Sequence, residues 1–309
     1  MKHLAILGLG GVGGYLGGML ARNFANDASI SISFICRGEH LKKIQDVGLH
    51  VKTPSLDFTV TPDQATDQVA SLKAIDFLFC CTKSYDLKNA LLSLKSCMHP
   101  DSIIIPLLNG VDSYDEIKKI YPDNPVWNAC IYIVSRLIAP GQILVSGIEP
   151  KLYFGSEKTN DDTVEFFKQW MHDASIPAIY TREILQAMWE KYFFISPVAS
   201  LTSWLNLTIG EFRIIPKHMA TLLQLISELN SVAEKLEIPV DSHIEKIVLD
   251  RVSFLPHETT SSMHSDFIKK SKTELESLTG YIVRLAKSHH IPVPTYEIIY
   301  KELSLKNNS

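Results

Sequence analysis

The chain has 309 residues, of which 46% are hydrophobic and 21% are charged, and its formal net charge is −4. These values predict a folded protein with two domains rather than a disordered chain. The absence of a long basic run argues against a nucleic-acid partner. No stretch of about 18 apolar residues predicts a membrane span, and the first apolar run is too short for a signal peptide.

The five cysteines are odd in number, and they show neither CxxC spacing nor an accompanying histidine cluster. This pattern predicts neither a disulfide framework nor a structural zinc site. We therefore expect no metal and a cytoplasmic location.

The first half of the chain alternates short apolar runs with helical stretches. The runs predicted as strands are 4–9, 30–36, 74–82 and 102–108. The stretches predicted as helices are 14–25, 38–47, 84–96 and 112–119. Continuous apolar strands alternating with helices are typical of a parallel sheet that is covered on both faces.

Three more β-rich pieces, a helix and a final strand complete this pattern, at 126–135, 142–147, 151–154, 162–174 and 176–181. Beyond this point the apolar spacing is helical, at 183–205, 216–237, 241–254, 273–289 and 294–304. The sequence thus predicts an α/β protein: a Rossmann-type doubly wound domain over 1–182 and an all-helical domain over 183–309.

A G-x-G-x-x-G motif lies between the first strand and the first helix. Its residues are Gly8, Leu9, Gly10, Gly11, Val12 and Gly13. In this context the glycines permit a tight turn, close approach of a pyrophosphate, and close packing of helix and strand. We expect a dinucleotide site, and the alternative is that the glycines serve only the turn.

The end of the second strand bears on the choice between NAD and NADP. NAD-binding proteins usually have an acidic residue there, whereas this chain has Arg37, followed by Glu39. A guanidinium pairs with a 2′-phosphate, so Arg37 favours NADP. Two alternatives stay open: Arg37 is a solvated cation, or Glu39 binds the ribose of NAD.

Lys191 interrupts an otherwise apolar run, "MWEKYFFISPVAS" (188–200). A lysine in such a place either snorkels to solvent along the core or presents a cation to a binding cleft. The run alone favours snorkelling.

Four further stretches carry a family resemblance. They are "CTKSYD" (81–86), "LLNGVD" (107–112), "LQAMWEK" (185–191) and "TSSMHSDFIKKSKTELESLTGY" (260–281). With the glycine motif and the helical second half, they make the chain resemble the ketopantoate reductases (2-dehydropantoate 2-reductases). The last stretch matches the family signature at Ser261, Ser262, Met263, Asp266, Thr273 and Glu274.

The resemblance implies that Lys191 is the proton donor, and desolvation would make it a better acid by lowering its pKa. It implies that Glu274 orients Lys191, accepts a hydrogen bond from the substrate or contacts the cofactor; otherwise Glu274 is an ordinary helix carboxylate. Ser262 would bind the substrate carboxylate, with a helix N-cap as the alternative. Lys83 and Asn109 would meet the nicotinamide ribose and the substrate, unless they serve turns.

Asparagines that the family uses for substrate recognition are replaced by Ile195, Ala199 and Ile209. Ser196, Ser200 and Ser203 are candidate replacements, but the sequence leaves their orientation open. The resemblance therefore supports the type of reaction better than the substrate.

The resemblance implies NADPH-dependent reduction of 2-dehydropantoate to (R)-pantoate, a step towards pantothenate and coenzyme A. One alternative is a reductase of a more apolar 2-oxo acid. A second is a regulatory protein that binds NADP without turnover. The expected partner is a small 2-oxo acid, with neither nucleic acid nor membrane, and a homodimer is one candidate oligomeric state.

Overall fold

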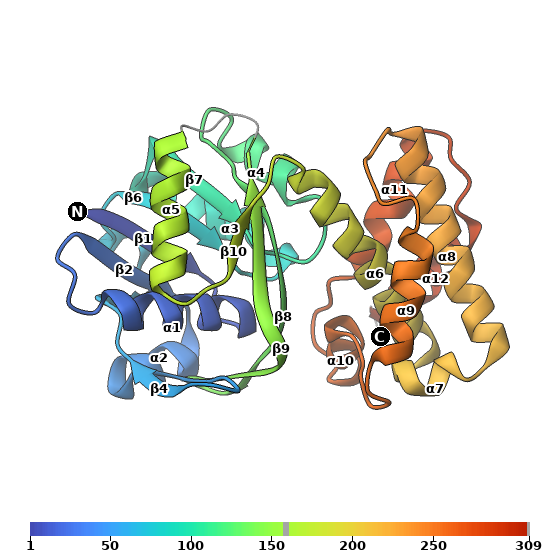
Figure 1. Ribbon diagram of the computed structural model, residues 1–309, viewed down its shortest axis with the longest axis horizontal. Coiled ribbons are helices and arrows are strands. Elements are labelled where there is room, and N and C mark those ends of the chain that lie inside the picture. Colours follow the sequence, from blue (N-terminus) through green and yellow to red (C-terminus); the bar gives the residue numbers. More distant parts are fainter. Residues whose placement is uncertain (157–160, 308–309) are drawn as a thin grey trace. The chain divides into compact units, whose positions relative to one another are not determined.

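The computed structural model describes residues 1–156 and 161–307. The chain forms two compact units (Figure 1). The first unit contains Met1–Leu108 and Ser113–Ile184, and the second contains Asn109–Asp112 and the chain from Leu185 onwards. Asn109 therefore belongs with the helical part of the chain, although it closely follows a strand of the first unit.

A five-stranded parallel sheet is the centre of the first unit, in the order β5-β2-β1-β6-β7. Its strands are β1 (Lys2–Leu7), β2 (Ile30–Ile35), β5 (Gln64–Thr66), β6 (Ile75–Cys80) and β7 (Met98–Pro106). The last residues of all five strands are in register, so the segments that follow them leave the sheet at one edge. The chain reverses its winding direction between β1 and β6, where such folds bind ligands.

Helices cover both faces of this sheet, because strand side chains alternate between two apolar clusters. They are α1 (Gly11–Phe24), α2 (Gly38–Val47), α3 (Ser84–Ser93), α4 (Ser113–Ile120) and α5 (Asp161–Asp173). Leu4 and Ile6 of β1 pack with α1 and α5, whereas Ala5 and Leu7 pack with α3 and α4. The predicted doubly wound sheet is confirmed.

A second sheet, which the sequence did not predict, packs on α1. Its strands are β3 (Leu49–Lys52), β4 (Asp57–Val60), β8 (Asn128–Ala139), β9 (Gln142–Gly155) and β10 (Ala178–Tyr180). The predicted strands 142–147 and 151–154 are parts of β9. A Cβ on Gly14 would lie 2.4 Å from Ile143 of this sheet, and one on Gly18 would lie 2.5 Å from Val51. The further glycines of α1 thus allow a helix to lie closely against a second sheet.

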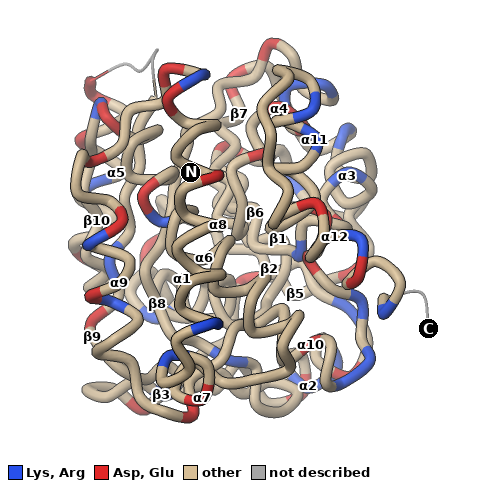
Figure 2. The backbone as a smooth tube through the Cα atoms, turned by 90° about the vertical axis from the view of Figure 1, so that its right-hand side faces the viewer, with Lys and Arg blue, Asp and Glu red and all other residues tan. Residues whose placement is uncertain are grey.

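Charged residues of both signs are spread over helices and loops (Figure 2). Of the three central strands, β2 has none, β1 has Lys2 and β6 has Asp76. The Lys2 ammonium and the Asp76 carboxylate pair at 2.7 Å. The interior of the sheet is therefore almost entirely apolar.

The second unit is helical around its own apolar core. Its α-helices are α6 (Ile184–Leu205), α7 (Ile209–Arg213), α8 (Pro216–Lys235), α9 (Ile244–Phe254), α10 (Ser262–Ile268), α11 (Tyr281–Ser288) and α12 (Pro294–Asn307). The helix predicted over 273–289 instead begins with a turn of π-helix, η3 (Glu276–Gly280), which continues into α11. Within the described residues, no helix is long and apolar enough to span a membrane.

Candidate active site

The glycine motif forms the turn between β1 and α1. Gly8 has φ +92°, and a Cβ there would lie 2.9 Å from the backbone nitrogen of Thr82, which follows β6. A Cβ on Gly13 would lie 1.9 Å from the Gly8 carbonyl oxygen. These two glycines are therefore required by the fold of the protein itself.

Gly10 is different, because a Cβ there would meet nothing within 4 Å. It is the N-cap of α1, which has neither a side-chain cap nor an acidic residue in its first turn. A helix N-terminus with this composition favours an anion. Open space at Gly10 beside that N-terminus fits the pyrophosphate of a dinucleotide.

Arg37 lies at the N-cap of α2, directly after the loop from β2, and its side chain is 82% exposed. Its guanidinium pairs with Asp86 of α3 at 3.2 Å. An exposed ion pair contributes little to stability, about 0–1 kcal/mol, so a phosphate can replace Asp86 at low cost. Glu39, in the first turn of α2, is exposed as well.

Lys83 is half-buried at the N-cap of α3, directly after Thr82. The segment from Cys81 therefore runs from the Gly8 turn to Lys83 at the strand edge where ligands are expected. Burial raises the pKa of the Cys81 thiol far above its usual range, which excludes a reactive thiolate there. Lys83 therefore lies where the resemblance expects a cofactor-binding residue.

In the second unit, the Lys191 ammonium donates a hydrogen bond to the Asn109 side-chain oxygen at 3.4 Å. Lys191 comes from the second turn of α6 and is half-buried. Asn109 comes from the loop Asn109–Asp112, where Gly110 has φ +110° and lies against Ser277 of η3. The structure thus brings together two of the predicted site residues, which are 82 positions apart in the chain.

Glu274 and Ser262 differ in exposure. Glu274 is 2% exposed and directly precedes the turn that leads into η3, so it is not an ordinary solvated carboxylate. Ser262 is exposed at the first position of α10. The N-cap of that helix is Ser261, whose hydroxyl accepts from the His264 amide at 3.0 Å. The N-cap role that was the alternative for Ser262 is therefore filled by Ser261.

Two family models match this chain: ketopantoate reductase PanE/ApbA over residues 4–158, and its C-terminal domain over residues 183–307. The chain belongs to the ketopantoate reductase family. The members of this family are oxidoreductases.

Relatives match over most of their length. An uncharacterized oxidoreductase, YkpB of Bacillus subtilis, is 25% identical over 99% of this chain and 98% of its own. The 2-dehydropantoate 2-reductase of Aquifex aeolicus is 27% identical over 75% of this chain and 76% of its own.

Solved structures match the whole fold. The 2-dehydropantoate 2-reductase of Porphyromonas gingivalis is 32% identical, with a TM-score of 0.84 and coverage of 98% of this chain and 99% of its own. A D-mandelate dehydrogenase with NADH and anilino(oxo)acetate is 20% identical, with a TM-score of 0.88 over 100% of this chain and 99% of its own. The second similarity shows the fold alone.

The positions that carry asparagines in the ketopantoate reductase resemblance are apolar here, and two of them lie in the core. Ala199 is 2% exposed and Ile209 is 1% exposed, whereas Ile195 is partly exposed. Ala199 and Ile209 pack in the apolar cluster of the second unit. This chain therefore has no polar group at these three positions.

Two of the three candidate serines of α6, Ser196 and Ser200, bond to the π-helical turn, whereas the buried Ser203 hydroxyl has no hydrogen-bond partner among the described residues. Ser196 donates to the Leu278 carbonyl at 2.6 Å, and the Ser200 hydroxyl pairs with that of Thr279 at 2.8 Å. Both serines are fully buried. Their hydroxyls therefore stabilise the π-helical turn.

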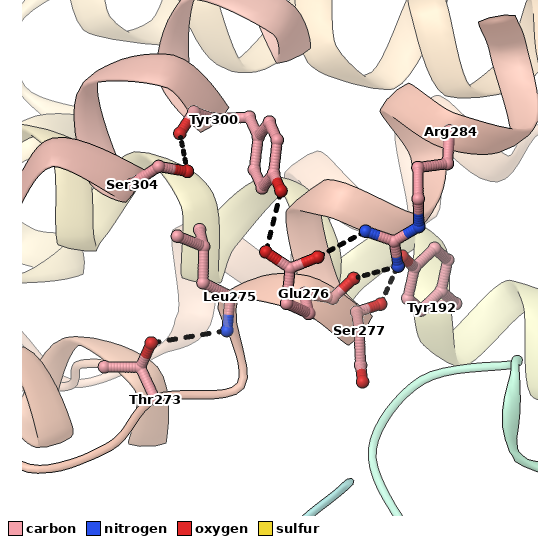
Figure 3. A network of polar contacts seen from close by, with 8 residues as sticks. All are labelled: Tyr192, Thr273, Leu275, Glu276, Ser277, Arg284, Tyr300 and Ser304. Carbon is pink, nitrogen blue, oxygen red and sulfur yellow. Dashed lines mark hydrogen bonds and ion pairs between the residues drawn. The ribbon is translucent and has the colours of Figure 1, made fainter. Parts of the chain in front are cut away.

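Tyr192, next to Lys191, is a residue that sequence reasoning missed. Its hydroxyl lies 2.9 Å from the Ser277 carbonyl and 3.0 Å from that of Leu278, and Figure 3 shows the Ser277 bond. Burial keeps the pKa of Tyr192 well above its usual range, so the hydroxyl stays a donor. No sequence pattern predicts such a contact. The carbonyls of a π-helical turn need hydrogen-bond donors, and here the donor comes from another helix.

Glu276 lies two residues from Glu274 in a different environment. Figure 3 shows its exposed carboxylate between the Arg284 guanidinium and the Tyr300 hydroxyl, which donates to it at 2.7 Å. The same guanidinium donates to the Glu276 carbonyl at 3.0 Å. Glu276 therefore serves the turn itself, whereas Glu274 is the buried carboxylate.

His264, within the stretch that matches the family signature, is buried and only 4% exposed. Its ring pairs with the Asn206 side-chain oxygen at 3.0 Å and with the Thr260 hydroxyl. Burial lowers its pKa, and the weaker attraction of Glu211 opposes this. The contact with Asn206, which follows α6, joins positions 58 apart in the chain, so no local sequence pattern predicts it.

Proposed function

We propose that this protein reduces 2-dehydropantoate to (R)-pantoate with NADPH, in the biosynthesis of pantothenate and coenzyme A. The observation that supports this best is the half-buried Lys191 with its ammonium directed at Asn109, 3.4 Å away. A cation held in this way is a proton donor with a fixed position, which reduction of a 2-oxo acid requires. Membership in the ketopantoate reductase family, whose members are oxidoreductases, supports this proposal.

The proposed site residues bind the cofactor, hold the substrate or serve the proton transfer, and Asn109 and Glu274 each have two of these tasks. The main chain of Gly8–Gly13 binds the pyrophosphate, Arg37 binds the 2′-phosphate, and Lys83, Asn109 and Glu274 bind the cofactor near its nicotinamide end. NADPH, when bound, supplies a hydride to the 2-oxo carbon.

Lys191 then transfers a proton from Nζ to the oxygen of the former carbonyl, which would otherwise stay an alkoxide, and regains a proton from solvent. Glu274 keeps Lys191 in position, and Asn109 and Ser262 hold the substrate. In this proposal residues 1–182 form the cofactor domain, and residues 183–309 form the substrate domain.

Our choice of NADPH rests on Arg37 and competes with NADH. The exposed guanidinium forms a surface ion pair with Asp86, which a 2′-phosphate can replace. Exposed Glu39 is the group that would bind the ribose of NAD instead. The fold does not decide, since a D-mandelate dehydrogenase with the same fold is described with NADH.

The apolar residues at 195, 199 and 209 favour a second candidate, a reductase for a 2-oxo acid with a more apolar side chain. Each lost amide removes hydrogen bonds of about 0.5–1.5 kcal/mol. A third candidate is a regulatory protein that binds NADP without turnover. We further propose a cytoplasmic homodimer, which light scattering coupled to size-exclusion chromatography tests.

The deciding experiment follows NADPH absorbance with 2-dehydropantoate, pyruvate or 2-oxoisovalerate, and repeats each assay with NADH. The expected result is rapid loss of NADPH with 2-dehydropantoate. The Lys191→Ala variant should lose about 100- to 10,000-fold in turnover. The exposed Lys246→Ala substitution on α9 is the control and should leave the rate unchanged.

Other outcomes separate the candidates. Turnover of only the apolar 2-oxo acids keeps the mechanism and changes the substrate. Tight binding of NADP without turnover of any 2-oxo acid supports the regulatory protein.

A further inference from the structure

His40 lies three residues after Arg37 in the first turn of α2, and the proposed function gives it no task. Its half-buried ring connects two segments that are far apart in the chain. Nε2 lies 2.9 Å from the carbonyl oxygen of Leu9, inside the glycine motif. Nδ1 accepts the backbone N–H of Gly141 at 2.8 Å, in the turn between β8 and β9.

These two contacts determine the protonation of the ring. The Gly141 amide can only donate, so Nδ1 carries no proton. The Leu9 carbonyl can only accept, so Nε2 carries the proton and donates it. His40 is therefore neutral, with both ring nitrogens in hydrogen bonds.

The bond to Leu9 acts on the neighbouring amide. In a trans peptide the C=O and the following N–H lie in one plane and point in opposite directions. Holding the Leu9 carbonyl towards His40 directs the Gly10 N–H away from it. Gly10 is the position where the loop has open space and where a pyrophosphate is expected.

A second contact from the same hairpin acts on the next part of the loop. The Ser135 hydroxyl of β8 donates to the Gly11 carbonyl at 2.8 Å. By the same planar geometry it directs the Val12 N–H away from Ser135. The carbonyls of Leu9 and Gly11 are thus both bound by groups that the β8–β9 hairpin provides or supports.

We propose that His40 and Ser135 form a loop clamp, in which His40 is a positioning residue that presets the glycine loop for a dinucleotide. This inference rests on the proposed dinucleotide function. A preset loop loses less conformational entropy when it binds, so the clamp acts on affinity for the dinucleotide and not on the proton transfer.

The test measures NADPH binding to the whole protein by isothermal titration calorimetry, without any 2-oxo acid. His40→Phe keeps a ring but makes neither bond, and should raise the Kd about tenfold. His40→Gln keeps one donor and one acceptor, and should restore the Kd to within about twofold. His172→Phe on α5, whose side chain is 84% exposed, is the control and should bind like the wild type.

In turnover assays with saturating 2-oxo acid and varied NADPH, His40→Phe should raise the KM for NADPH and leave kcat within about twofold, as a positioning role requires. A folded His40→Phe protein with wild-type affinity overturns the proposal. If that variant does not fold, His40→Asn decides, since it keeps the acceptor for Gly141 but is too short for Leu9. Wild-type affinity of that variant also overturns the proposal.

The same titration separates this inference from the proposed function. A wild-type protein that binds neither NADPH nor NADH contradicts the dinucleotide function itself, whatever the variants do. Binding of NADPH by the wild type that the His40 variants leave unchanged contradicts only the loop clamp.

Discussion

The glycine loop of the first unit (Gly8–Gly13) and the lysine region of the second unit (Lys191, Asn109 and Glu274) are built in opposite ways. The loop offers main-chain groups, and Gly8 and Gly13 are needed because other backbone atoms come too close for a side chain. The lysine region offers side chains, and those of Lys191 and Asn109 meet across 82 positions of the chain. The glycine loop depends on the absence of side chains, whereas the lysine region depends on the positions in which its side chains are held.

The supports of the two regions differ in the same way. Strand register brings Gly8 next to Thr82, and register follows from the sheet as a whole. Lys191 instead lies on a helix whose buried hydroxyls, from Tyr192 and Ser196, bond to the π-helical turn. The loop should therefore respond to added volume, and the lysine region to lost polar groups.

The largest expected effect is the loss of the buried carboxylate in the lysine region. Glu274→Gln should reduce turnover by about 100-fold or more, because the proposed role of Glu274 depends on its charge. The matched change Glu276→Gln should leave turnover within about twofold, since that carboxylate is exposed and serves the turn. Initial rates with saturating cofactor measure both, and equal rates for the two variants would remove Glu274 from the site.

The second effect separates ligand from fold within the glycine loop. Gly10→Ala should leave the melting temperature unchanged but weaken NADPH binding by about tenfold or more, because its Cβ would meet no protein atom within 4 Å but would meet the proposed pyrophosphate. Gly13→Ala should lower stability by about 1–3 kcal/mol or more, since its Cβ would meet the Gly8 carbonyl oxygen at 1.9 Å. Calorimetric unfolding and NADPH titration measure the pair. Normal affinity in Gly10→Ala would contradict the proposed position of the pyrophosphate.

The third effect concerns the buried support of the lysine region. Tyr192→Phe should destabilise the protein by about 1–3 kcal/mol, because the buried Ser277 carbonyl loses a donor. Tyr300→Phe removes a hydroxyl that bonds to an exposed carboxylate and should cost less than about 1 kcal/mol. Urea unfolding followed by far-UV circular dichroism compares the two. Equal losses of unfolding free energy in the two variants would show that burial of the acceptor does not change the cost of removing the hydrogen bond.

The smallest effect is a pH dependence of stability in the second unit. Burial lowers the pKa of His264 in the folded state below that of the unfolded chain, about 6.5. As the pH falls below about 6.5, the unfolded chain takes up a proton that the folded protein does not, so the unfolding free energy decreases.

His264→Gln should reduce this decrease between pH 7 and about pH 5. The His243→Gln substitution, at the exposed N-cap of α9, is the control and should leave this decrease unchanged. Urea unfolding at several pH values measures the slopes, and an unchanged slope in His264→Gln would show that His264 titrates normally.

The sequence by itself determined the features that depend on local chemistry. The glycine motif follows an apolar strand and opens a helix, and the positions that need glycine lie within a few residues of one another in the sequence. The alternation of strands and helices predicted the parallel sheet, because both of its faces are covered and its strands are continuously apolar. The family signature likewise lies in a few short stretches, so the ketopantoate reductase family was predictable.

The tertiary structure alone decided features that depend on distant partners. Strands β3, β4 and β5 are short and partly polar, and they form because a neighbouring strand supplies their hydrogen bonds. The orientation of Ser196 and the burial of His264 follow from packing between helices, which period and composition do not encode.

The contact of His40 with the glycine loop belongs with these features. It is a bond between a helix, a loop and a hairpin that are neighbours only after the second sheet has packed on α1. The sequence predicted the glycine loop as a dinucleotide site and singled out Lys191, because local sterics and residue type suffice for these predictions. The groups that hold the loop and the lysine in place were decided by packing, because each is a contact between segments that are distant in the chain.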